Sequence, residues 1–133
     1  MGTNHACHPG DHVDELHVSQ ALVGNRLYWN AAYRCEECNC EVEEDGEGDM
    51  PAQYRSLLLD RQGSWGIYIG EMTDQFANIL KVLRKALNRS IDELMQIKSR
   101  IPGILLTGTR YEMIRLQNML AQEGLASSVV RLV

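Results

Sequence analysis

Apolar positions recur with a regular period through the second half of the chain. From residue 65 to residue 72 they alternate with other residues, which predicts a β-strand. Intervals of three and four residues follow, and they predict an amphipathic helix capped by Thr73 or Asp74. The apolar stripe of this helix consists of Phe76, Ile79, Leu80, Leu83 and Leu87.

Two capping signatures mark the starts of two further helices. Ser90 precedes Glu93, and Thr109 precedes Glu112, at the spacing that lets each pair satisfy exposed backbone donors reciprocally. We expect the second of these helices to end at Gly124, because glycine adopts the left-handed conformation that commonly follows a helix.

Short apolar stretches at 104–107 and 126–133 complete this half and predict two more strands. The predicted order from residue 65 is therefore β-α-α-β-α-β. We predict an α+β protein in which a sandwich with a three-stranded sheet follows a smaller N-terminal module.

The middle of the chain is polar. Glycines interrupt a run of acidic residues at 41–49, where like charges repel each other, and we predict a solvated loop there.

Pro51 stands at a favourable first helical position before three consecutive leucines, which predicts a connecting helix. We expect this helix to dock one module on the other, with three residues at the interface: Tyr54, Leu57 and Leu58.

These elements divide the chain into an acidic module at 1–50, a connecting helix and linker at 51–64, and the sandwich at 65–133. The length of 133 residues, of which 44% are hydrophobic, fits one globular domain or two very small ones. No apolar run approaches the roughly 20 residues of a membrane-spanning helix, and no secretion signal is recognisable. We therefore expect a cytoplasmic protein.

The net charge of −5 hides an asymmetry between the two halves. Residues 1–60 hold twelve Asp and Glu against three Arg, which gives −9, whereas residues 61–133 hold six acids against ten Lys and Arg, which gives +4. An acidic half repels nucleic acid and attracts basic partners. We expect neither a nucleic-acid nor a membrane partner.

All four cysteines lie in the acidic half, and in a reducing compartment they are expected to be thiols or metal ligands. Cys35 and Cys38 have the spacing that lets two thiolates reach one zinc ion. Cys7 is the only thiol outside their neighbourhood, so we predict it as the third ligand of one structural zinc. The fourth ligand stays open among four candidates, of which we favour the first: His12, His8, His5 and Cys40.

Three other interpretations of the cysteines remain: reduced thiols packed in a small core, redox chemistry, and a catalytic zinc. His12 with Cys35 and Cys38 resembles the ligand set of zinc-dependent nucleobase deaminases. The deaminase glutamate position holds Asp14, however, and Arg34 stands where those enzymes have proline. We therefore favour a structural site, and the module resembles a zinc ribbon.

The stretch 65–133 resembles the C-terminal domain of the bacterial ribosomal stalk protein in element order, helix lengths and its closing valine-rich strand. The segment Ile79-Leu-Lys-Val-Leu-Arg84 resembles the first-helix motif of that family. The stretch is also similar, more remotely, to the adaptor that delivers substrates to the Clp protease. The resemblance implies protein binding through helix surfaces, with Lys81 and Arg84 at the basic positions that dock translation factors.

No nucleophile-base motif, phosphate-binding glycine loop or paired-carboxylate arrangement is visible, so we predict that the chain is not an enzyme. The favoured hypothesis is a bacterial protein-binding module, either an adaptor or an immunity protein that neutralises a basic toxin. Its predicted partner-binding acids are Glu41, Glu43, Glu44, Asp45, Glu47 and Asp49. The alternatives are a translation-associated factor that binds the ribosome or a GTPase through Lys81 and Arg84 and, less favoured, a zinc hydrolase or deaminase.

Overall fold

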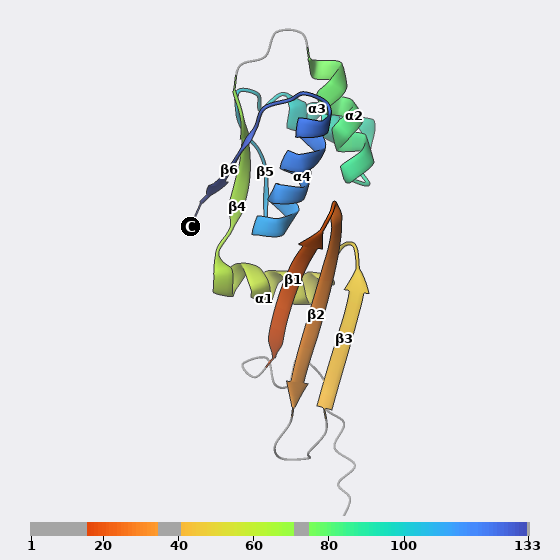
Figure 1. Cartoon of the computed structure of the whole chain (residues 1–133). Helices are drawn as coiled ribbons and strands as arrows, with labels where there is room; N and C mark the ends of the chain where they lie inside the picture. Colours follow the sequence, from red (N-terminus) through yellow and green to blue (C-terminus); the bar gives the residue numbers. More distant parts are fainter. Residues whose placement is uncertain (1–15, 35–40, 71–74, 133) are drawn as a thin grey trace, which may run out of the picture. The chain divides into compact units, whose positions relative to one another are not determined.

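The computed structural model describes residues 16–34, 41–70 and 75–132 (Figure 1). The chain divides into two compact units, Met1–Leu58 and Leu59–Val133. Within the described ranges the protein is α+β, with two three-stranded antiparallel sheets and four helices. The predicted fold class is confirmed at this level. No helix in these ranges is long and apolar enough to cross a membrane.

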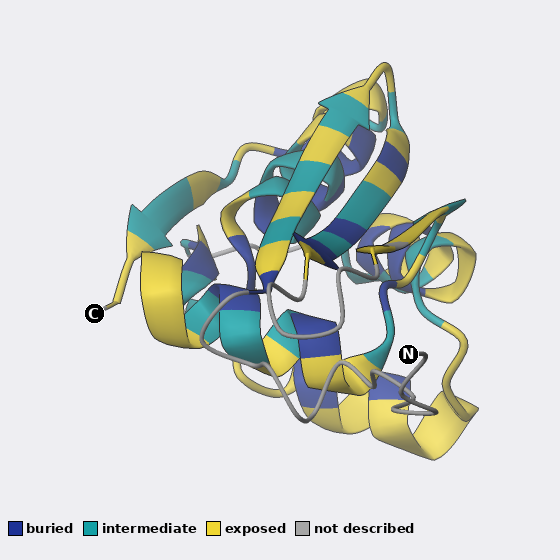
Figure 2. Cartoon of the chain, turned by 90° about the horizontal axis from the view of Figure 1, so that it is seen from below, coloured by how far each residue is buried: buried dark blue, intermediate teal, exposed yellow. Residues whose placement is uncertain are grey.

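The first sheet is a meander of β1 (His17–Val23), β2 (Arg26–Arg34) and β3 (Glu41–Glu47), in that order. A two-residue turn joins β1 to β2, and its first residue, Gly24, has a φ of 63°. A positive φ of this kind suits a tight hairpin and favours glycine. Exposed and half-buried residues alternate strictly along β1, because only one face of the sheet is covered (Figure 2).

The loop predicted at 41–49 is wrong, because residues 41–47 form β3. Backbone pairing with β2 and exposure of the carboxylates offset the repulsion within the acidic run. Gly46 also has a packing role, since a Cβ there would lie 2.7 Å from Nε1 of Trp29. The glycine lets an indole from β2 cover β3, which supplies apolar packing that the acidic segment itself lacks.

The core of the first unit joins the inner face of this sheet to α1 (Ala52–Gln62). Leu16, Ala31 and Tyr33 pack there with Met50, Tyr54 and Leu58. Pro51 precedes the helix, and its carbonyl accepts hydrogen bonds from the N–H groups of Tyr54 and Arg55. The predicted helix is therefore present, and Tyr54 and Leu58 are buried against the first sheet.

The second unit contains β4 (Trp65–Ile69), α2 (Phe76–Ala86), α3 (Ile91–Lys98), β5 (Gly103–Gly108), α4 (Arg110–Gln122) and β6 (Ser128–Arg131). Its strand order is β5-β4-β6, and all pairs are antiparallel. The predicted order β-α-α-β-α-β is confirmed from residue 65 onward. The strand predicted at 126–133 is shorter, because only Ser128–Arg131 pairs with β4.

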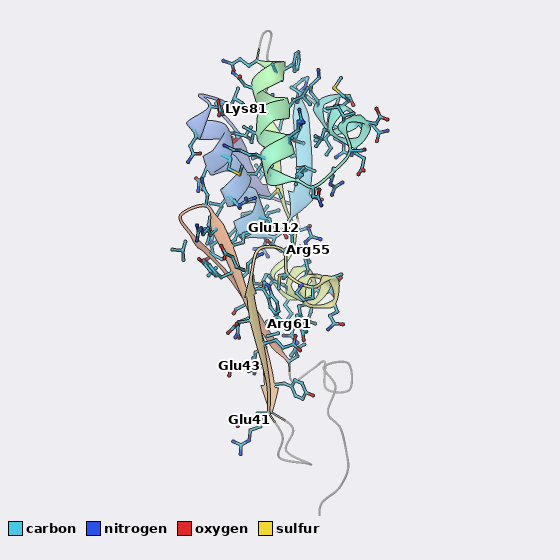
Figure 3. All side chains as sticks on the ribbon, turned by 90° about the vertical axis from the view of Figure 1, so that its right-hand side faces the viewer. Glu41, Glu43, Arg55, Arg61, Lys81 and Glu112 are labelled. Carbon is cyan, nitrogen blue, oxygen red and sulfur yellow. The ribbon has the colours of Figure 1, made fainter. Side chains whose placement is uncertain are left out.

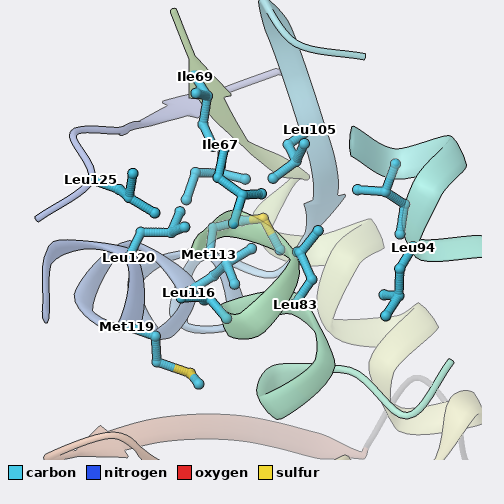
Figure 4. Close-up of a cluster of buried hydrophobic side chains, with 13 residues drawn as sticks. Ile67, Ile69, Leu83, Leu94, Leu105, Met113, Leu116, Met119, Leu120 and Leu125 are labelled. Atoms are coloured by element: carbon cyan, nitrogen blue, oxygen red, sulfur yellow. The ribbon is translucent and has the colours of Figure 1, made fainter. Parts of the chain in front are cut away.

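Local capping fixes the starts of α3 and α4 as predicted. For α2 the N-cap is Gln75, which makes no side-chain capping bond, and the predicted caps Thr73 and Asp74 lie outside the described residues. The Ser90 and Thr109 side chains accept from the N–H groups of Glu93 and Glu112, and both capping boxes are complete. After α4, Gly124 has a φ of 75°, and the N–H of Leu125 donates to the carbonyl of Leu120. Thirteen buried residues of the described part of this unit form one core between the sheet and the three helices (Figure 4).

Candidate functional site

The candidate site is the face of the first sheet that carries no part of its core. In an antiparallel pair, directly opposed residues point to the same face. Buried Ala31 opposes Glu44 and half-buried Trp29 opposes Gly46, so Glu44 and Gly46 lie on the inner face of β3. The odd-numbered residues of β3 point to the opposite, outer face. Figure 3 shows two of them, Glu41 and Glu43, on the side of β3 away from α1.

Four carboxylates therefore form one line on the outer face. We call this line the acidic row, and it consists of Glu41, Glu43, Asp45 and Glu47. All four residues are exposed. Residues at positions i and i+2 of a strand lie roughly 6.7 Å apart, so the four residues of the row extend over about 20 Å. The result is a narrow band of negative potential along one edge strand.

Cross-strand arginines neutralise only the two ends of the acidic row. Nε of Arg34 lies 3.7 Å from Oε1 of Glu41, and Nε of Arg26 lies 3.7 Å from Oε1 of Glu47. The central carboxylates, Glu43 and Asp45, oppose Ala32 and Asn30 and form no ion pair with a described residue. The centre of the row thus carries two charges that a basic partner could neutralise.

The other two acids predicted to bind a partner lie elsewhere. Glu44 accepts a hydrogen bond from Oη of Tyr54 at 2.9 Å on the inner side of β3. Burial of the Tyr54 ring, together with that carboxylate, raises the pKa of the phenol above its usual value. Asp49 is exposed but lies beyond the end of β3. The structure groups four of the six predicted acids and separates Glu44 and Asp49 from them.

The predicted zinc ligands Cys7, Cys35, Cys38 and His12 lie outside the described residues, as do the alternatives His5, His8 and Cys40. Within the described ranges, no group of three His, Cys, Asp or Glu residues could hold a metal.

The described residues that flank the two cysteine-bearing segments lie at one end of the first sheet. His17, the first residue of β1, pairs with Ala32, and Arg34, the last residue of β2, pairs with Glu41. Segments 1–15 and 35–40 therefore join the sheet at neighbouring points. This attachment is compatible with ligands drawn from both segments, and their thiol and imidazole groups suit zinc.

In the second unit, the predicted cationic pair lies on α2. Nζ of Lys81 is 3.2 Å from Oε1 of Glu123, whereas Arg84 is exposed in the last turn. The structure adds two exposed apolar residues on α3, Ile91 and Met95, with exposed fractions of 54% and 43%. The buried residues of α3 are Leu94 and Ile97.

Comparisons with known proteins give no assignment: no family model, curated protein or solved structure matches the chain. The resemblance of residues 65–133 to the ribosomal stalk domain accordingly stays a prediction.

Proposed function

We propose that the chain is a non-catalytic protein-binding module of the adaptor or immunity type, acting in the bacterial cytoplasm. Its partner would be a basic protein, such as a toxin, which the acidic row binds. The observation that carries this proposal is the unneutralised centre of the row, formed by Glu43 and Asp45 beside the small side chains Ala32 and Asn30. Small neighbours leave both carboxylates accessible to the long side chains of lysine or arginine.

The acidic row would act first on the rate of encounter. A line of like charges focuses the field at the surface and accelerates association with a protein of opposite charge. Arg26 and Arg34 limit this field to the middle of β3, because they pair with the terminal carboxylates. We therefore expect Glu43 and Asp45 to contribute most to partner binding, and Glu41 and Glu47 to contribute less.

We also propose one structural zinc held by Cys7, Cys35, Cys38 and His12, with His8, His5 and Cys40 as alternatives for the last position. The support is the common end of the sheet from which segments 1–15 and 35–40 leave. A zinc there would tie the start of the chain to the β2–β3 connection. Among the described residues of the first unit, six form its buried core cluster, and small modules often depend on a metal for folding.

Native mass spectrometry of the protein purified gently from its own host tests both proposals. We expect the wild type to carry one zinc ion and a stoichiometric basic protein. The double variant Glu43→Lys with Asp45→Lys should keep the zinc and lose the partner. The matched control, Asp60→Lys with Asp92→Lys, changes the net charge equally at exposed sites and should keep both.

Two results contradict the proposed function. Equal loss of the partner from the variant and its control would show that net charge alone matters. Retention of the partner by the variant would remove the acidic row as the binding surface. A wild-type protein without metal would separately refute the structural zinc.

A second candidate is a translation-associated factor that binds through α2 and α3. The observation that favours it is the exposure of Ile91 and Met95, which stand four residues apart and so lie on one face of α3. The basic residues Lys81 and Arg84 would complement an acidic ribosomal factor or GTPase. Lys81→Glu with Arg84→Glu should abolish such binding, and retained binding would exclude this surface.

A further inference from the structure

We propose that the basic partner adds an extended, antiparallel strand to the open edge of β3, with Lys or Arg at every second position. This inference rests on the proposed function, since it specifies how the acidic row is recognised. Among the described residues, β3 pairs with β2 alone, so its other edge presents backbone groups that no described strand pairs with. An open edge is the surface to which an extended peptide adds by main-chain hydrogen bonds.

The register identifies which residues of β3 direct their backbone groups toward this edge. The N–H of Gly48 donates to the carbonyl of Leu27 at 2.8 Å, so this position faces β2. Positions in an antiparallel pair alternate between those that face the neighbour and those that face away. The alternation continues through β3 without a register shift and assigns the outward-facing N–H and C=O groups to Glu41, Glu43, Asp45 and Glu47.

The residues of the acidic row therefore present two recognition elements together. Each offers main-chain groups that no described strand pairs with and a carboxylate on the outer face. A residue of an added antiparallel strand that opposes Glu43 or Asp45 would exchange hydrogen bonds with it and point its side chain to the same face. Positive residues at alternate positions would thus meet the carboxylates, and a continuous basic run would place half of its charges on the other face.

The charge of the acidic row favours a basic strand at the edge of β3 over residues 1–15 or a second copy of β3. Residues 1–15 contain Asp11, Asp14 and Glu15 and no Lys or Arg, so they would be repelled. A second copy of β3 would bring carboxylates against carboxylates. An alternative role of the acidic row is to prevent self-association, because charged edge strands do not pair with each other. A row with this role alone would have no affinity for a basic strand.

The test titrates the full-length protein with a nine-residue peptide in which lysine alternates with threonine, while NMR follows amide exchange. Binding should slow exchange at Glu43 and Asp45 by about tenfold or more and leave Glu44, which faces β2, unchanged. A peptide of the same composition with its lysines in one block should bind about threefold to tenfold more weakly. Attraction by charge alone would instead give equal affinities and no protection at the edge, which would overturn the proposal.

Backbone methylation provides the second arm. In the antiparallel register the lysine amides face β3, so N-methylation of the lysines should weaken binding by about tenfold or more. N-methylation of the threonines, whose amides face away, should change affinity by less than about twofold. Equal effects of the two methylations would overturn the assigned register.

A matched pair of protein variants completes the design. Glu43→Gln with Asp45→Asn should lower the affinity about threefold to tenfold, whereas Asp60→Asn with Asp92→Asn should leave it unchanged. Failure of this inference is distinguishable from failure of the proposed function. If the alternating peptide gives no edge protection while charge reversal still releases the host partner, strand addition is wrong and the acidic row remains the binding surface.

Discussion

The two sheets of this protein are covered to different extents. Among the described residues, thirteen form the buried core cluster of the second unit, whereas six form that of the first. In the second unit, Leu83, Leu105 and Leu120 are fully buried between a sheet and three helices (Figure 4). The first unit buries Tyr54 and Leu58 from a single helix and leaves an acidic strand at its edge. The described part of the second unit therefore has more apolar burial to stabilise it than the described part of the first.

The largest effect is expected from loss of the proposed zinc. Cys35→Ser with Cys38→Ser should release the metal and unfold β1–β3, because zinc binding in small modules contributes on the order of 10 kcal/mol to folding. The second unit should keep its amide chemical shifts, since its core is independent of the metal. NMR with metal analysis measures both outcomes.

The control for this variant is Cys40→Ser, which should keep the zinc. Loss of metal from the control would move Cys40 into the ligand set. If the first sheet stays folded without metal, its own apolar core is enough to fold it. That result would contradict the proposed difference between the two units.

Truncation in the larger core should have the next effect. Leu120→Ala should lower the free energy of unfolding of the second unit by about 2–5 kcal/mol, because Leu120 is fully buried. Met95→Ala, at an exposed position of α3, should change this free energy of unfolding by less than about 0.5 kcal/mol. Chemical denaturation measures this difference, and similar losses for the two variants would refute the assigned core.

The packing of Trp29 on β3 predicts a smaller loss in the first unit. Gly46→Val should destabilise it by about 1–3 kcal/mol, because the new side chain overlaps the indole. Trp29→Ala should make the same valine better tolerated, so the two substitutions should be non-additive in thermal unfolding. Additive losses would show that the indole does not restrict Gly46.

The smallest effect concerns the hydrogen bond between Tyr54 and Glu44. Because the folded state raises the pKa of Tyr54 above 10.0, the phenol contributes stability that is fully present below pH 10. This contribution is lost as the pH rises through the folded pKa. Tyr54→Phe should cost about 1 kcal/mol near neutral pH and flatten the decline above pH 10. An unchanged alkaline decline in the variant would assign it to other groups.

The sequence predicted the second unit well, because its signals are local. Ser90 with Glu93 and Thr109 with Glu112 fix helix starts through contacts three residues apart. The acidic strand was missed, because the residues that stabilise it come from β2. Trp29 covers Gly46, and Arg34 pairs with Glu41 across the sheet. Nothing within 41–49 alone reveals these partners.

One local signal for the candidate site was nevertheless present. Glu41, Glu43, Asp45 and Glu47 recur with a period of two, which is the period of a strand. The loop prediction rests on charge repulsion, which takes no account of this period. The separation of Glu44 from the row follows from the same alternation, whereas its bond to Tyr54 depends on the helix that comes after it.

The central claim is that the acidic row binds a basic partner, and association kinetics at several ionic strengths test it most directly. With the partner recovered from the host, the wild-type rate should fall steeply as salt is added. Glu43→Lys with Asp45→Lys should associate more slowly and with a weaker dependence on salt. An unchanged rate and an unchanged salt dependence in this variant would contradict the account.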